Sequence, residues 1–169
     1  MAVDTTIRRP QAPAAPIEVI PFAAGFGAAM ATTDARVIDL FRNLGLNLLT
    51  YMQIIDDLRD ACPPDGPLLD YEQGKKTIPL VFFADGGTPQ DGAGNGSILS
   101  ASARAAQFRE AFEKSRAQLF TAILAETYLN RAKADLATLK GTLKDGAVNN
   151  LEGFIQGVEF DPQGIIPSP

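Results

Sequence analysis

The chain has 169 residues, of which 46% are hydrophobic and 21% charged, a length and composition typical of one globular domain. Its formal net charge of -5 argues against an extended nucleic-acid surface, because such surfaces gather Lys and Arg against phosphate. The absence of histidine and the single cysteine exclude Ser-His-Asp and Cys-His catalysis, imidazole metal sites and thiolate zinc sites. Any bound metal is therefore expected to have oxygen ligands, which favour Mg²⁺ over Ca²⁺ as the candidate ion.

The composition along the chain predicts one helical domain between two irregular ends. Residues 1–16 are predicted to form a flexible arm, and Pro10 and Pro13 interrupt the apolar segment that a twin-arginine leader needs. The domain is expected over residues 17–160, with an unstructured tail at 161–169. No run of about 18 apolar residues occurs, so no membrane span is predicted. The free cysteine is consistent with a cytoplasmic location.

Two helices are predicted in the first third of the domain. Residues 17–31 are apolar and rich in Ala and Gly, which indicates a short buried helix on which other helices pack closely. Thr32, Thr33 and Asp34 then offer an N-cap for a long helix from Ala35 to about Ala61. Its apolar residues recur every three or four positions and form one core-facing stripe: Val37, Phe41, Leu44, Leu48, Tyr51, Ile55 and Leu58.

The long helix is predicted to end at the sequence PPDGP, residues 63–67, which cannot continue it. A loop to about Lys76 follows. Residues 77–84 (TIPLVFFA) are apolar, and their length does not separate a strand from a buried helix. We favour a helix because no partner strand is visible. Residues 85–97 are rich in glycine and are expected to form a mobile loop.

The remaining chain also has helical periodicity. A helix is predicted from Ile98 to about Leu129, a second from Asn130 to about Leu143, and a short one over residues 148–158. The predicted fold class is therefore all-α, a single helical bundle.

The candidate chemistry begins near the end of the long helix, in the sequence QIIDDLRD. Asp56 and Asp60 lie four residues apart on one face, on the flank of the apolar stripe with Gln53, while Asp57 lies about 100° round the helix. Carboxylates gathered at a core edge repel one another unless a cation lies between them, which favours a magnesium site. The alternative is a solvated acidic face that Arg59 partly neutralises.

A second element follows ten residues after Asp60, in the sequence DYEQGKKTIPL. Gly74 allows a close approach of backbone, and the adjacent lysines Lys75 and Lys76 could hold a diphosphate already bridged by Mg²⁺. The alternative is a plain loop whose lysines face water.

Together these two elements resemble the second aspartate-rich motif, and the loop after it, of the trans-polyprenyl diphosphate synthases, the polyprenyl synthetase family. The spacing Asp-x-x-x-Gly-Lys-x-Thr-x-Pro, from Asp70 to Pro79, is the most specific part of the resemblance. The resemblance covers roughly residues 17–158 and corresponds to the second half of a family member.

The resemblance implies a bundle of antiparallel helices around a deep cavity, as in the second half of an isoprenoid synthase fold. It implies a prenyltransferase that binds an allylic isoprenoid diphosphate through Mg²⁺ and transfers the allylic group to isopentenyl diphosphate. By position, Asp56 and Asp60 would be magnesium ligands and Asp57 a supporting ligand. Gln53 would neighbour the diphosphate, and Lys75 would contact it.

The printed sequence departs from the family in holding one aspartate-rich motif, whereas family members have an earlier one followed by arginines. Catalysis is therefore predicted to need a second chain or a second copy, which makes a homo- or hetero-oligomer the expected state. Two alternatives stay open: a non-catalytic regulatory or binding subunit of a prenyl diphosphate synthase, and a helical interaction module.

Overall fold

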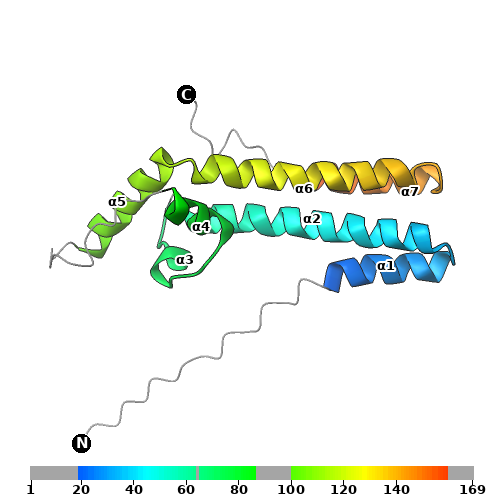
Figure 1. Ribbon diagram of the computed structural model, residues 1–169, viewed down its shortest axis with the longest axis horizontal. Coiled ribbons are helices and arrows are strands. Elements are labelled where there is room, and N and C mark those ends of the chain that lie inside the picture. The colour runs from blue at the N-terminus through cyan, green and yellow to red at the C-terminus, as the bar shows by residue number, and fades with distance from the viewer. Residues whose placement is uncertain (1–18, 64, 87–99, 160–169) are drawn as a thin grey trace, which may run out of the picture.

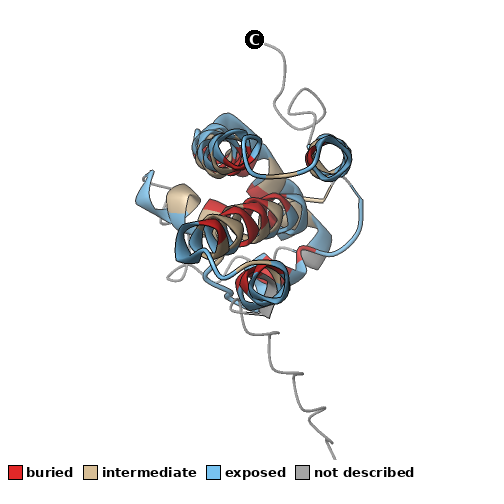
Figure 2. Cartoon of the chain, turned by 90° about the vertical axis from the view of Figure 1, so that its right-hand side faces the viewer, coloured by how far each residue is buried: buried red, intermediate tan, exposed pale blue. Residues whose placement is uncertain are grey.

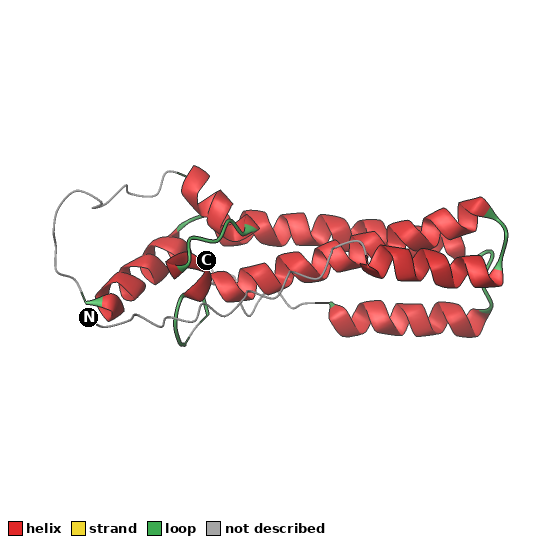
Figure 3. Cartoon of the chain, turned by 90° about the horizontal axis from the view of Figure 1, so that it is seen from below, coloured by secondary structure: helices red, strands yellow, loops and turns green. Residues whose placement is uncertain are grey.

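A computed structural model describes residues 19–63, 65–86 and 100–159. The predicted all-α class is confirmed: 81% of these residues are helical, and this part of the chain contains no strand (Figures 1 and 3). The helices are α1 (Val19–Ala31), α2 (Ala35–Ala61), α3 (Leu69–Glu72), α4 (Ile78–Asp85), α5 (Ala101–Lys114), α6 (Ala117–Leu139) and α7 (Asp145–Val158). None of these described helices combines the length and the apolar character needed to cross a bilayer.

Helix α2 is the central element, and it begins where the sequence predicts. The Asp34 side chain caps it, because its Oδ1 accepts a hydrogen bond of 2.9 Å from the backbone N–H of Arg36, one of the donors that a helix start leaves unpaired. Of the predicted stripe, Phe41 is half-buried and the others are buried: Val37, Leu44, Leu48, Tyr51, Ile55 and Leu58.

The main core lies between α2 and α6, which run antiparallel along most of their length. Figure 2 looks along the bundle and shows buried residues concentrated on the helix at its centre. The α6 side of this core consists of Ala125, Leu129, Ala132, Leu136 and Leu139, with Ile155 added from α7. Asn47 Nδ2 donates a hydrogen bond of 2.8 Å to Asp135 Oδ2, which links the two long helices at the edge of this core.

Helix α1 lies against the first half of α2 through a face of small residues. Pro21, Gly25 and Ala28 are buried there, and a Cβ on Gly25 would lie 3.3 Å from Arg42 Nε, so the approach is close. The prediction of a buried helix is nevertheless wrong for the opposite face, where Phe22 and Met30 are 68% and 77% exposed. The apolar composition of α1 therefore serves a narrow contact with α2 and leaves an apolar surface.

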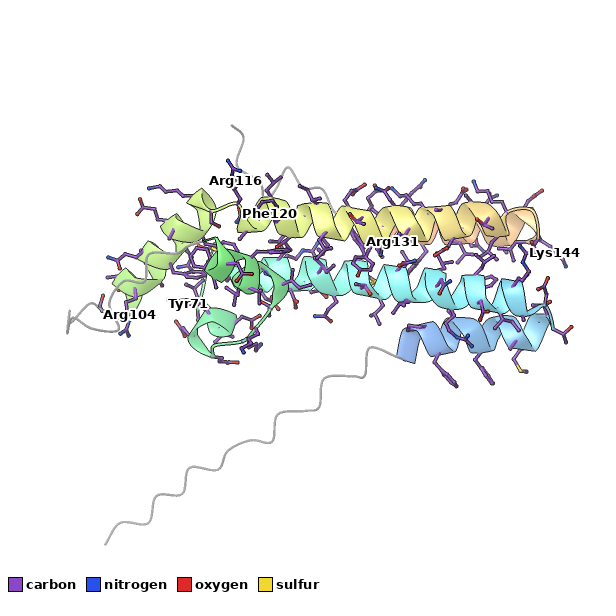
Figure 4. All side chains as sticks on the ribbon, viewed as in Figure 1. Tyr71, Arg104, Arg116, Phe120, Arg131 and Lys144 are labelled. Carbon is purple, nitrogen blue, oxygen red and sulfur yellow. The ribbon has the colours of Figure 1, made fainter. Side chains whose placement is uncertain are left out.

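A second core cluster holds the far end of α2 against α4 and α5. It contains Ala61, Leu68, Phe108, Phe112 and Ala117. Phe83 of α4 lies with its ring centroid 5.2 Å from that of Phe108 and 5.4 Å from that of Phe112. Tyr71 of α3, labelled in Figure 4, lies 4.0 Å from Phe108 between ring centroids. This cluster fixes the segment after α2 beside the aspartates.

Several predicted boundaries differ from the structure. The chain breaks between α5 and α6 at Ser115, whose Oγ donates to Phe112 O (2.6 Å) and accepts from the N–H of Ala117 (3.2 Å), while α6 continues without interruption through residues 129 and 130. The loop expected to reach Lys76 contains α3, and α7 begins three residues before the predicted 148.

Other predictions fall outside the described residues. These are the arm at 1–16, the tail at 161–169 and nearly all of the glycine-rich loop at 85–97. The exceptions in that loop are Asp85, the last residue of α4, and Gly86, its C-cap.

Candidate functional site

The three aspartates of α2 lie in different surroundings. Asp56 is exposed, and its Oδ1 lies 3.5 Å from Arg59 Nη1, so it faces solvent on the flank of the helix. Asp57 is half-buried, and its Oδ1 accepts a hydrogen bond of 2.9 Å from Gln53 Nε2. Asp60 is exposed, one turn beyond Asp57. Residues three apart neighbour each other on a helix, so Asp57 and Asp60 form one acidic face.

Burial is the main cause of the raised pKa of Asp57. The negative charges of Asp70 and Asp60 raise it further, whereas hydrogen bonds from Gln53 and from the backbone N–H of Ile78 lower it. The donors do not fully compensate the charge on Asp57. The carboxylate therefore favours a proton or a nearby cation.

The segment between α2 and α4 places Lys75 beside this acidic face. Lys75 Nζ lies 2.5 Å from Asp70 Oδ1. The hydrogen bond to Asp70 and that residue's charge raise the pKa of the Lys75 ammonium, and the charges of Asp60 and Asp57 raise it further. Lys75 therefore interacts with carboxylates of two separate elements, α2 and α3.

Lys75 is thus paired with Asp70 and lies within electrostatic reach of Asp57 and Asp60, and Gln53 is hydrogen-bonded to Asp57. Asp56, on the same helix, pairs with Arg59 at 3.5 Å. Asp70 also belongs to this site as the partner of Lys75, although no role was predicted for it from the sequence. The sequence signal for it was its position in the Asp-x-x-x-Gly-Lys spacing, since burial and the partner of its side chain are set by the fold.

The segment between α2 and α4 ends where α4 begins, at Ile78. Thr77 precedes the helix and Pro79 lies in its first turn, where the missing proline N–H removes no helical hydrogen bond. Thr77 Oγ1 is the one buried side-chain nitrogen or oxygen in the described ranges without a hydrogen-bond partner. The backbone N–H of Ile78, the next residue, lowers the pKa of Asp57.

The donor set is compatible with Mg²⁺ in its chemistry. Its oxygens are carboxylates, which a hard cation prefers. Within the described residues, no three acidic, cysteine or histidine side chains gather closely enough to hold a metal by themselves. Protein-bound Mg²⁺ commonly uses one or two carboxylates and takes its remaining ligands from water and substrate phosphates. Asp57 and Asp60 would supply such a pair.

Comparison of the chain with models of known protein families, with curated proteins and with solved structures gives no match. The polyprenyl synthetase family is therefore a hypothesis that depends on the two sequence motifs alone.

Proposed function

We propose that this protein binds an allylic isoprenoid diphosphate through Mg²⁺ and acts as a prenyltransferase together with a second copy or another polypeptide. The observation that supports this proposal is the position of Lys75, which is paired with Asp70 and interacts with Asp57 and Asp60. An acidic pair beside an oriented ammonium suits a diphosphate: the carboxylates attract the cation, and the ammonium donates to the phosphate oxygens.

In this proposal Mg²⁺ would neutralise the diphosphate and so help it leave as the allylic carbon–oxygen bond breaks. The chain itself contributes binding and orientation. Asp57 and Asp60 would hold the cation, with Asp56 at the margin of the site. Gln53 orients the Asp57 carboxylate through its 2.9 Å hydrogen bond, and Lys75 would bind a phosphate oxygen.

A second candidate is a non-catalytic subunit that binds the diphosphate or a partner without turnover. The observation that favours it is the exposed apolar face of α1, where Phe22, Phe26 and Met30 are 68%, 58% and 77% exposed. A cytoplasmic location is part of both candidates and stays a prediction. Incubating the protein with an allylic diphosphate, isopentenyl diphosphate and Mg²⁺, alone and with candidate partners, separates the two: product formation supports the enzyme, and binding without product supports the subunit.

Calorimetry with pyrophosphate tests the site. We expect binding with Mg²⁺ and much weaker binding when a chelator removes the metal. Asp57→Asn and Asp60→Asn should weaken binding more than the matched Asp56→Asn. Lys75→Ala should weaken it about tenfold to 100-fold, the range for hydrogen bonds to charged groups, and Lys76→Ala should have a smaller effect.

Two results would contradict the proposal. The first is pyrophosphate binding that is equally strong with and without Mg²⁺. The second is an equal effect of the Lys75 and Lys76 substitutions, which would mean that the lysines act only through general charge.

A further inference from the structure

The short helix α3 ends in a backbone motif that returns the chain over the helix. Gly74 has a φ of +63°, in the left-handed region. Its N–H donates to Tyr71 O (3.1 Å), and the N–H of Lys75 donates to Asp70 O (2.9 Å). This pair of hydrogen bonds around a left-handed glycine is the Schellman motif. It places Lys75 next to Asp70 in space although five residues separate them.

The side chains at these two positions of a Schellman motif are commonly apolar and touch each other. Here they form an ion pair instead, with 2.5 Å between Lys75 Nζ and Asp70 Oδ1. The Asp70 side chain is 7% exposed and that of Lys75 is 47% exposed. A buried carboxylate is costly without a charged or hydrogen-bonding partner, so the pair constrains the ammonium strongly while leaving it open to solvent.

The segment that carries Asp70 is held against the rest of the fold. Leu68, directly before α3, is fully buried in the second core cluster. Tyr71 packs on Phe108 of α5, and Arg109 of α5 donates to the Gly66 carbonyl at 2.6 Å. Helix α5 thus holds both ends of the segment that carries Asp70.

We propose that Asp70 is a positioning residue, which directs the Lys75 ammonium toward a diphosphate bound at Asp57 and Asp60. This inference rests on the proposed function. An ammonium has three N–H donors. One is bound by Asp70, and two remain for phosphate oxygens. Because the buried carboxylate already restricts the Lys75 side chain in the free protein, less conformational entropy is lost when the ammonium binds a ligand.

Positioning and simple electrostatics predict opposite effects for Asp70→Asn. The substitution removes a negative charge near an anion site, so electrostatics alone predicts tighter diphosphate binding. Loss of positioning predicts weaker binding, because Lys75 must then be ordered by the ligand. Glu72→Gln is the matched control, since it removes one exposed negative charge from the same helix.

The experiment measures pyrophosphate affinity in the presence of Mg²⁺ by calorimetry. Asp70→Asn should weaken binding about tenfold, toward the effect of Lys75→Ala. Glu72→Gln should leave the affinity unchanged or raise it. In a Lys75→Ala background, Asp70→Asn should cause no further loss. Gly74→Ala disturbs the same geometry through the backbone and should also weaken binding, which provides a second variant if Asp70→Asn does not fold.

A spectroscopic measurement on the free protein separates this inference from the proposed function. In a proton–nitrogen correlation spectrum of the lysine side chains, the Lys75 ammonium should give a resolved signal that Asp70→Asn abolishes and Glu72→Gln retains. If that signal is absent from the wild type, or if Asp70→Asn binds pyrophosphate as tightly as the wild type, the positioning role is wrong while the proposed function stands. If the wild type binds no pyrophosphate, the proposed function fails and the role of Asp70 toward a ligand fails with it, even where the ion pair is observed.

Discussion

Asp57 illustrates how one residue carries both a stability cost and a candidate function. It is half-buried at the end of a helix whose other polar side chains there are exposed. Two further carboxylates, Asp60 and Asp70, interact with it. Neighbouring like charges raise the cost of ionising a half-buried carboxylate, and perturbed carboxylates of this kind are candidates for binding sites.

The raised pKa of Asp57 predicts how stability changes with pH. Because the folded state holds the proton more tightly than the unfolded chain, the wild type should lose stability relative to Asp57→Asn as pH rises through the carboxyl range, from about pH 3 to about pH 7. Urea denaturation of the two proteins across this range is the measurement. Asp65→Asn, an exposed carboxylate outside the cluster, controls for general charge. A stability difference that grows in the opposite direction contradicts the assignment.

At the scale of elements, the start of α2 depends on a side-chain cap. Asp34→Ala removes the acceptor for the Arg36 N–H, so the free energy of unfolding should fall by about 1 kcal/mol. Asp34→Asn keeps an oxygen acceptor and should retain most of the stability. Denaturant unfolding curves of the three proteins test this, and an unchanged midpoint for Asp34→Ala would show that the cap contributes nothing.

The end of α3 depends on backbone conformation instead. Gly74→Ala places a Cβ on a residue with a φ of +63°, which should cost about 1–2 kcal/mol although the surrounding space is open. Gly141→Ala, also in open space but without a positive φ, is the control and should cost less. Thermal unfolding of both variants measures the difference. Equal effects would mean that the left-handed conformation of Gly74 is not required.

At the scale of the whole molecule, α2 spans two packed regions. Its buried residues from Val37 to Ile55 belong to the long core with α6, and Ala61 at its end belongs to the aromatic cluster with α4 and α5. The acidic face lies near the junction of these regions. The site geometry therefore depends on both the bundle and the cluster.

The exposed face of α1 predicts association. Phe22, Phe26 and Met30 recur every four residues on one face, and α1 carries no charged side chain that would oppose a second apolar surface. We expect light scattering at tens of micromolar protein to show a dimer or larger species, and the double variant Phe22→Ser, Phe26→Ser to shift it toward monomer. Phe154→Ser on α7 is the control for an exposed aromatic residue elsewhere. A wild-type monomer unaffected by Mg²⁺ and pyrophosphate would contradict this prediction.

The sequence alone determined the helical class and the cap and extent of α2, whereas the apolar segment 77–84 fitted a strand or a buried helix by its length, and the favoured helix is α4 in the structure. These features follow from local rules: the spacing of apolar residues, a capping side chain before the helix, and Pro and Gly at its end. The candidate aspartates of α2 and Lys75 could also be identified from the sequence, because the type and spacing of charged residues are part of the sequence itself.

The tertiary structure alone decided three features. It placed the break at Ser115, where no Pro or Gly marks it and a side-chain hydroxyl replaces helical hydrogen bonds. It left one face of α1 uncovered, since apolar composition does not say which neighbours a helix meets. It also paired Lys75 with the buried Asp70 and brought the ammonium within electrostatic reach of Asp57 and Asp60. Helical periodicity fixes the direction of each side chain relative to its own helix, but packing against other helices fixes what that side chain meets.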